Sequence, residues 1–247
     1  MEKCFSDMAR VVLSLGGSVL FPTLETHRLL SYAPVLKRLA QYLELFVVVG
    51  GGGEARRYIQ VARECGADEA SCDEIGIMVT RLNATLLLAA LGDSACPGVA
   101  QTPGQARSCA GQGKIVVMGG VTPGQTTDAV AAVLAEMVGA DILVNLTSVD
   151  GIYSSDPRRD PDARRFSRMT HDELLGIVGA SGLEAGSNTV LDLVAAKVLK
   201  RSRIPLLVLD GRDPSLLEGV LSGQGGAGTL VSAGGKDPLP FRRSNAP

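Results

Sequence analysis

Five short runs of branched aliphatic residues recur along the chain and limit its fold more than any other feature. They are Val11–Leu15 (VVLSL), Leu45–Val49 (LFVVV), Ile115–Met118 (IVVM), Ile142–Leu146 (ILVNL) and Ile204–Leu209 (IPLLVL). Each run is apolar at nearly every position instead of alternating with polar residues, which is typical of strands buried on both faces of a parallel sheet. The runs therefore predict the strands of one such sheet.

Helical patterns lie between these runs. Residues 74–92 space their apolar side chains by three and four and end at Gly92, an expected C-cap. Further helices are predicted at 127–140, at 170–178, where Thr170 and Glu173 have capping-box spacing, and at 213–221, which Asp213 is expected to cap. Residues 102–113 are predicted to be a surface loop. Strands alternating with helices indicate the α/β class.

The composition narrows the functional class. The 247 residues carry a net charge of −2, which does not favour nucleic-acid binding, and show no repeat or linker. No run of about 18 apolar residues and no secretory leader is found, so no membrane partner is expected. Five scattered cysteines without a C-x-x-C pair and only two histidines favour a cytoplasmic protein with reduced thiols. We interpret residues 1–233 as one domain and 234–247 as a flexible tail.

Three of the predicted strands end in glycine-rich turns. These are Gly16–Gly17, the four glycines Gly50–Gly53, and Gly119–Gly120. Ligands of an open parallel sheet bind beyond the carboxyl ends of its strands, so the turns are expected to meet at one crevice. Exposed N–H groups and helix N-termini favour an anion there. Neither G-x-x-x-x-G-K-[ST] nor G-x-G-x-x-G is present, so the turns predict a phosphate site of another design.

Polar residues follow the turns. The hydroxyls of Thr126 and Thr127 can donate to phosphate. Asp128 either caps the helix that follows or orients catalytic donors or a magnesium ion. Tyr153 and Asp156 follow the strand at 142–146 and suit a nucleoside base and ribose, although an ordinary turn with a half-buried tyrosine is the alternative.

Several long segments, in order, resemble the amino-acid kinase family, and within it the archaeal-type uridylate (UMP) kinases. They are GGSVL, GGGEARRYIQVAR, DEIGIMVTRLNATLLLAALGD, GGVTPGQTTDAVAA and TSVDGIYSSDPRRDP. The resemblance extends over roughly residues 10–231. It implies a three-layer αβα sandwich around an open, mostly parallel sheet, with the phosphate acceptor in the N-terminal half and ATP in the C-terminal half.

The resemblance also implies an activity and its residues. The family transfers the γ-phosphoryl group of ATP to UMP, with Mg²⁺ as cofactor, and forms homohexamers (trimers of dimers). The implied UMP site consists of Gly51, Asp73, Val121, Thr122, Pro123, Gly124, Gln125, Thr126 and Thr127. The implied ATP site consists of Gly16, Gly17, Gly52, Arg56, Thr147, Tyr153 and Asp156. Gly17, Gly52, Arg56 and Asp128 are the implied catalytic residues, and no protein ligand to metal is assigned.

Two positions depart from the family pattern. Many members have a lysine two residues before the first turn glycine, where this chain has Ser14, and related kinases often have lysine at Gly53. Arg56 is the first candidate for the missing cation and Lys197 the second, although both also fit solvated helix surfaces. Asp73, expected to accept from the ribose, equally fits a helix N-cap.

Other activities of the same fold remain open. Isopentenyl phosphate kinases carry a histidine after the glycine turn, where this chain has Glu54, Ala55 and Arg56. Acetylglutamate and aspartate kinases need a site for an amino-acid carboxylate, and GGVTPGQTTD matches the UMP pattern better. A non-catalytic protein that binds a nucleotide or oxyanion is favoured only by the missing lysine.

Overall fold

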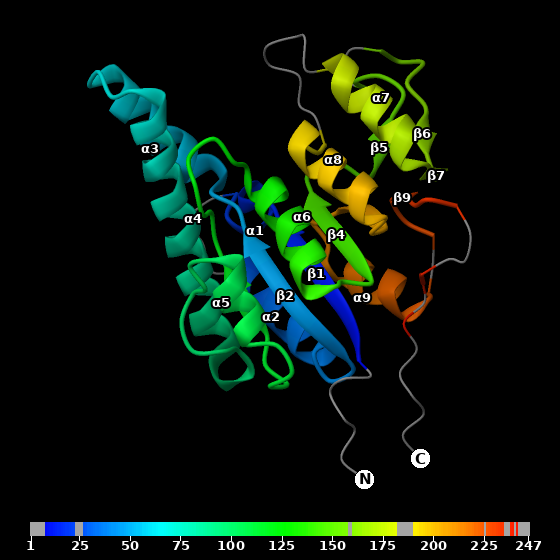
Figure 1. Ribbon diagram of the computed structural model, residues 1–247, viewed down its shortest axis with the longest axis horizontal. Helices are drawn as coiled ribbons and strands as arrows, with labels where there is room; N and C mark the ends of the chain where they lie inside the picture. The colour runs from blue at the N-terminus through cyan, green and yellow to red at the C-terminus, as the bar shows by residue number, and fades with distance from the viewer. Residues whose placement is uncertain are drawn as a thin grey trace.

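The protein is built around a seven-stranded sheet. The computed structural model describes residues 8–22, 27–157, 160–181, 190–224, 226–234, 238–239 and 241. Within them the strand order is β3-β2-β1-β4-β8-β9-β7 (Figure 1). The strands are β1 (Ala9–Leu15), β2 (Leu43–Val49), β3 (Val116–Met118), β4 (Ile142–Thr147), β7 (Arg168–Met169), β8 (Leu206–Asp210) and β9 (Thr229–Val231). A separate antiparallel pair joins β5 (Ile152–Tyr153) to β6 (Arg165–Phe166).

The five predicted strands are β1, β2, β3, β4 and β8, and all five run parallel. Only β9, antiparallel to β8, and its parallel neighbour β7 reverse the direction. The predicted open, mostly parallel sheet is therefore confirmed. Because β3, β2 and β1 are adjacent and parallel, the three glycine turns that follow them lie side by side at the carboxyl ends of these strands.

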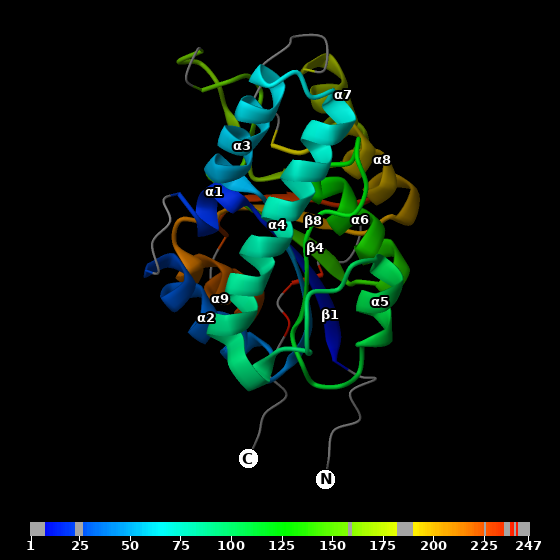
Figure 2. The same ribbon diagram turned by 90° about the vertical axis from the view of Figure 1, so that its left-hand side faces the viewer.

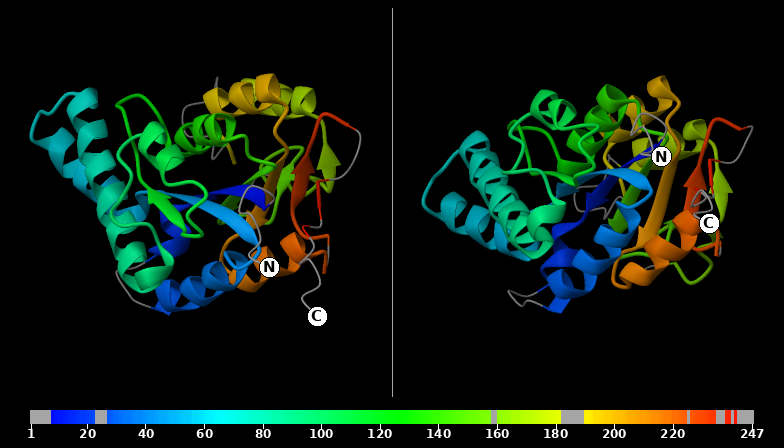
Figure 3. Two further views of the ribbon diagram at one scale, coloured as in Figure 1. Left: turned by 60° about the horizontal axis from the view of Figure 1, so that its bottom comes forward. Right: turned by 90° about the horizontal axis from the view of Figure 1, so that it is seen from below.

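Helices cover both faces of this sheet (Figure 3). Val11, Leu13 and Leu15 of β1 join one core cluster, and Val12 joins the other, as expected for a strand buried on both faces. The first face carries α1 (Gly17–Leu20), α2 (His27–Leu39), α4 (Glu69–Leu91) and α9 (Pro214–Ser222). The second face carries α5 (Pro103–Ser108), α6 (Thr127–Val138), α7 (His171–Ser181) and α8 (Leu193–Ser202). This is the predicted three-layer αβα sandwich.

The predicted helix caps are confirmed at three helices. Gly92 ends α4, and the Asp213 side chain caps α9. At α7 the Glu173 N–H donates to the Thr170 hydroxyl over 3.2 Å, and the Thr170 N–H donates to the Glu173 carboxylate over 2.6 Å. These two hydrogen bonds form the capping box expected from the sequence.

The prediction of a loop over residues 102–113 is wrong in its first half, where α5 forms. Thr102 caps this helix by accepting the Gln105 N–H at 3.1 Å, and Pro103 occupies the first turn. Ala106 is fully buried in the second core cluster. A capping threonine followed by proline is a helix-start signal, so the segment contained the information that the loop interpretation overlooked.

Helix α4 stands beside α3 (Gly52–Glu64) at one side of the molecule (Figure 2). The segment Glu69–Ser94, α4 with a 3₁₀ turn (Gly92–Ser94), is long and apolar enough to cross a membrane, since an 18-residue stretch of it has a mean hydropathy of 1.6. Core helices of soluble proteins pass the same test, and α4 contacts α2, α3, β2 and β3. Packing within the fold accounts for the 33% of that stretch that is buried.

Most of the predicted flexible tail lies outside the described residues. The structure describes residues 234, 238–239 and 241 of it. Leu239 and Phe241 are partly buried against the first core cluster, and the Phe241 N–H donates to the Leu221 carbonyl over 2.9 Å.

Candidate active site

The first two glycine turns are packed backbone to backbone. The Gly16 N–H donates to the Leu146 carbonyl over 3.0 Å, and the Gly50 N–H donates to the Leu15 carbonyl over 2.9 Å. A Cβ atom added to Gly52, which has φ +68°, would lie 2.6 Å from the carbonyl carbon of Gly17. Side chains are therefore excluded where the turn after β1 meets the turn after β2.

Helix α3 starts inside the four-glycine turn. Its N-cap is Gly51, and no side chain caps its first turn. The first N–H groups of such a helix lack intrahelical partners and can bind an anion. Gly53 has no atom within 4 Å of its Cβ position, so packing does not require glycine there.

Arg56 lies in the second turn of α3 and is exposed. Among the described residues it has no hydrogen-bond or ion-pair partner, whereas the neighbouring Arg57 pairs with Glu54 over 2.7 Å. The Arg56 guanidinium is therefore available to a ligand near the turn. This is compatible with its predicted role, which stays a prediction.

Helix α4 ties the second turn to the third through two buried polar side chains. Asn83 Nδ2 donates to the carbonyls of Gly50 and Gly51 over 3.0 and 3.2 Å. The Gly120 N–H donates to Thr80 Oγ1 over 2.6 Å. Sequence reasoning missed both residues. The available signal was two polar residues three apart within an otherwise apolar helix pattern, which places them on one face.

Asp73 joins α4 to the loop of residues 121–127. Its carboxylate accepts the Gly124 N–H over 2.7 Å. The alternative that Asp73 is an N-cap is wrong, because Asp68 caps α4 by accepting the Ser71 N–H over 2.8 Å. Arg81, also missed from the sequence, donates from Nε to the Gly120 carbonyl over 3.1 Å. Side chains of α4, Asp73 among them, thus bond to Gly51 and Gly124 of the predicted acceptor site.

Asp128 faces the first strand. Ser14 Oγ donates to its Oδ1 over 2.6 Å, so the residue in the position of the family's lysine is a hydrogen-bond donor without charge. The alternative that Asp128 caps α6 is wrong: Thr126 Oγ1 accepts the Ala129 N–H over 3.1 Å and is the N-cap. The Thr126 hydroxyl in turn donates to Asp192, so its proton is already used within the protein.

The surroundings of Asp128 raise the pKa of its carboxyl to about 6. Removal from water is the largest cause, because it disfavours the charged form. The hydrogen bond from Ser14 partly offsets it, and the negative charge of Asp192 adds to it. At neutral pH the site therefore holds an incompletely compensated carboxylate that a cation would stabilise.

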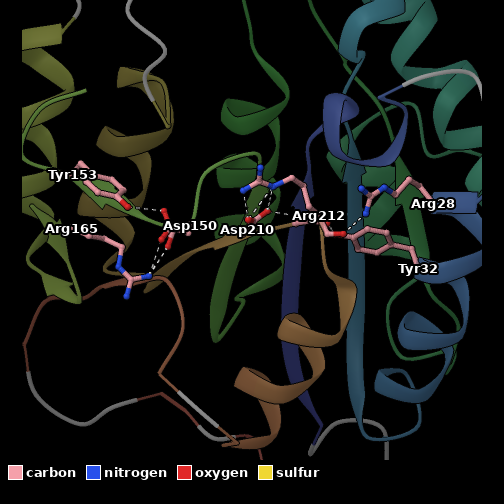
Figure 4. Close-up of polar contacts among 8 residues, drawn as sticks. Arg28, Tyr32, Asp150, Tyr153, Arg165, Asp210 and Arg212 are labelled. Carbon is pink, nitrogen blue, oxygen red and sulfur yellow. Dashed lines mark hydrogen bonds and ion pairs between the residues drawn. The ribbon is translucent and has the colours of Figure 1, made fainter. Parts of the chain in front are cut away.

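The predicted ATP residues lie nearer the carboxyl ends of β4 and β8. Thr147 ends β4, next to the Gly16 contact, and its carbonyl accepts the Gly211 N–H over 2.8 Å. Tyr153 lies in β5, and its hydroxyl donates to Asp150 over 2.9 Å, which raises the pKa of the phenol (Figure 4). Asp156 lies beyond β5, where its carbonyl accepts the Asp160 N–H over 2.9 Å. The hydrogen bond of Tyr153 is thus made within its own segment of the chain, to Asp150, and not to a glycine turn.

A row of charged groups beside this region was missed from the sequence (Figure 4). Arg212 pairs with Asp210 over 2.5 Å and holds the pKa of that carboxyl below its usual value. Arg28 donates to the Arg212 carbonyl, and the Tyr32 hydroxyl donates to the Gly211 carbonyl over 2.5 Å. The signal was present in LDGRDP, where charges directly follow a buried strand.

Lys197, the second candidate for the missing cation, is not at the glycine turns. It lines a cavity together with Arg203, which precedes β8. The cavity is therefore near the amino end of β8, whereas the glycine turns follow the carboxyl ends of the strands. Within the described part of the chain, no group of three or more His, Cys, Asp or Glu side chains could hold a metal ion.

An αβα sandwich whose glycine turns present helix N-termini at the carboxyl ends of its strands defines a protein that binds phosphate groups. The sequence profile of the amino acid kinase family matches residues 9–210. The chain belongs to that family.

Similar proteins support this placement. A uridylate kinase from Methanoculleus marisnigri is 59% identical over 94% of this chain and 100% of its own length. One from Methanospirillum hungatei is 58% identical, over 96% of this chain and 100% of its own length. The crystal structure of uridylate kinase from Archaeoglobus fulgidus superposes with a TM-score of 0.82 at 44% identity, covering 90% of this chain and 99% of that one.

Proposed function

We propose that the protein is a nucleoside monophosphate kinase that transfers the γ-phosphoryl group of ATP to UMP, giving UDP and ADP. The observation that carries this proposal is the backbone contact between Gly17 and Gly52. It brings the turn at Gly16–Gly17, proposed to hold the donor, against the four-glycine turn, whose Gly51 is proposed to face the acceptor, and no side chain fits between the two turns. The uridylate kinase relatives, which match over nearly the whole chain, support UMP as the acceptor.

The acceptor is proposed to lie between α4 and the loop of residues 121–127. Asp73 holds that loop by accepting the Gly124 N–H, and its second carboxylate oxygen would accept from the ribose. The Arg81 guanidinium donates to the Gly120 carbonyl and so places a positive charge beside the same loop. Gly51, whose carbonyl accepts from Asn83, would face the acceptor phosphate.

ATP is proposed to lie over the turn at Gly16–Gly17 and the ends of β4 and β8. Thr147, Tyr153 and Asp156 would contact its nucleoside part. Phosphoryl transfer needs in-line positioning and stabilisation of charge more than covalent chemistry. The uncapped N-terminus of α3 and the Arg56 guanidinium would supply that stabilisation. No general base is required, because the UMP phosphate is already an ionised nucleophile.

The partly uncompensated Asp128 carboxylate is proposed to face a cation of the complex. Ser14 holds one carboxylate oxygen, which fixes the orientation of the side chain at the start of α6. When bound, Mg²⁺ would neutralise charge on the ATP phosphates, and Asp128 is the proposed side chain to orient toward it or toward its water ligands. The role of Ser14 is then to position Asp128.

A coupled assay of ADP release with each nucleoside monophosphate tests the activity. We expect turnover with UMP well above that with AMP or GMP. The lack of a lysine at position 14, where Ser14 instead donates to Asp128, favours a second function, non-catalytic binding of a nucleotide. Binding of ATP without turnover of UMP would establish that second function and refute the first.

We further propose that the protein acts as a homohexamer built from dimers in the cytoplasm. Tyr58 and Val61 of α3, together with Met78 and Leu82 of α4, are 58–60% exposed apolar side chains on neighbouring helices. Such a surface supports a subunit contact. The four described cysteines are free thiols, which supports a reducing compartment. Light scattering coupled to size exclusion measures the subunit number.

A further inference from the structure

A cavity lies near the amino end of β8, at the end of the sheet opposite to the glycine turns. Its volume is about 660 Å³, within the range of small-molecule sites. It is bordered by the start of α7, by α8 from Lys197 onward and by Ala233, two residues after β9. Helix α8 ends just before β8 begins. The lining residues are Thr170, His171, Asp172, Leu175, Lys197, Lys200, Arg201, Arg203 and Ala233.

The lining is strongly basic, with four cations and one carboxylate. Two cations are compensated within the chain: Lys200 pairs with Asp172 over 2.5 Å, and Arg201 pairs with Glu136 over 2.5 Å. The side chains of Lys197 and Arg203 have no hydrogen-bond or ion-pair partner among the described residues. Two uncompensated positive charges therefore share one concave surface, which concentrates anions.

The remaining wall indicates which anions fit. His171 is buried, and its Nε2 lies 2.9 Å from the Ile204 carbonyl, so the imidazole is part of the wall. Of the described residues that line the cavity, none is a Phe, Tyr or Trp that could stack on a base. Lysine and arginine side chains recognise phosphate oxygens directly. The cavity suits the phosphate groups of a ligand rather than its base.

Helix α8 connects this cavity to the acceptor loop. Its N-cap is Asp192, which accepts from the Thr126 hydroxyl within the loop of residues 121–127. Its middle and its last turn carry Lys197, Lys200 and Arg201. The pair of Arg201 with Glu136 also joins α8 to α6, the helix that carries Asp128 at its start. One ten-residue helix thus contacts both sites.

We propose that this cavity is a regulatory site for a polyphosphate-bearing anion, and that α8 couples its occupation to binding of UMP. The anion would bind Lys197 and Arg203 and compete with Asp172 for Lys200. A shift of α8 would then change the Asp192–Thr126 contact. The regulatory part rests on the proposed function, whereas the binding part does not require catalysis.

Calorimetry with inorganic tripolyphosphate tests the site. UMP and a non-hydrolysable ATP analogue are kept saturating to block the active site, at constant free Mg²⁺. We expect the variant K197E/R203E to lose at least tenfold in affinity relative to the unmodified protein. The matched control K37E/R107E reverses two exposed charges elsewhere and should bind as the unmodified protein does. Equal binding by all three proteins would overturn the proposal, even if UMP turnover is normal.

Kinetics test the coupling. Tripolyphosphate should change the KM for UMP in the unmodified protein and in the control variant, but not in K197E/R203E. Linkage requires UMP to change the affinity for tripolyphosphate by the same factor as tripolyphosphate changes the affinity for UMP. Retained binding without any change in UMP affinity would refute regulation. Repeating the calorimetry with nucleoside triphosphates distinguishes a nucleotide effector, which would bind more tightly, from an inorganic one.

Discussion

Replacing Asp128 by asparagine should stabilise the fold while damaging the activity. The folded-state pKa of this carboxyl is raised from 3.8 to about 6, mainly by removal from water. A carboxyl with a raised pKa stabilises the folded state only when protonated. That stability is complete below about pH 4 and is lost as pH rises through about 6. With about 1.4 kcal/mol per pKa unit, the ionised group costs the folded state about 3 kcal/mol at pH 7.5.

Asparagine keeps the shape and an oxygen that can accept from Ser14, but it carries no charge. We therefore expect Asp128→Asn to raise Tm at pH 7.5 by roughly 5 to 12 °C, given about 2–4 °C per kcal/mol for a chain of this size. The gain should fall to about half at pH 5 and nearly vanish at pH 4. In the same variant kcat should fall on the order of 10²-fold.

Thermal unfolding followed by circular dichroism, at one protomer concentration and several pH values, measures this difference. The control is Asp162→Asn, which neutralises an exposed carboxylate and should leave Tm nearly unchanged at each pH. A gain in Tm that is the same at pH 5 and pH 7.5 would show that proton binding is not its source. A variant less stable than the unmodified protein at pH 7.5 would refute the reasoning altogether.

Three further substitutions test the site. Arg56→Ala should lower kcat on the order of 10²-fold without unfolding, whereas Arg57→Ala, its matched control, should not; equal effects would remove Arg56 from the transition state. Asp73→Asn should mainly raise the KM for UMP, because the acceptor loop loses its anchor at Gly124; a KM effect confined to ATP would contradict the assignment. Gly52→Ala should destabilise by more than about 2 kcal/mol, because φ is +68° and the Cβ meets Gly17, whereas Gly53→Ala should be tolerated in urea unfolding.

The sequence was sufficient for the strands with continuous apolar runs, because burial on both faces leaves a strong local pattern. It was insufficient for β7 and β9, which hold only one and two apolar residues and so form no such run. Sheet order was also out of reach, since β4 pairs with β1 across more than a hundred residues. Helix caps were predicted where the capping residue was the only polar candidate, as at Asp213, and failed where several competed, as at Asp68 and Asp73.

The glycine turns were predictable as a phosphate site, but the contacts that organise them were not. Ser14 and Asp128 are 114 positions apart in the sequence, and each has a plausible local role that conceals the hydrogen bond between them. In the sequence, Asn83 and Thr80 are only polar residues within an apolar helix pattern. Their role becomes clear from the fold, in which they bond to the glycine turns. Local patterns therefore locate the site, whereas its polar connections depend on tertiary packing.

The positions of the positively charged side chains limit which of them can stabilise the transferred phosphoryl group. Ser14 cannot supply a charge and is bonded to Asp128, and Lys197 lies at the opposite end of the sheet. Arg81 donates to Gly120 on the acceptor side. Arg56 alone of these combines a place beside the four-glycine turn with the absence of a partner among the described residues. Because Asp128 adds negative charge to the same region, the proposed mechanism assigns to Arg56 and to a metal ion brought by ATP the task of offsetting both the carboxylate and the phosphates.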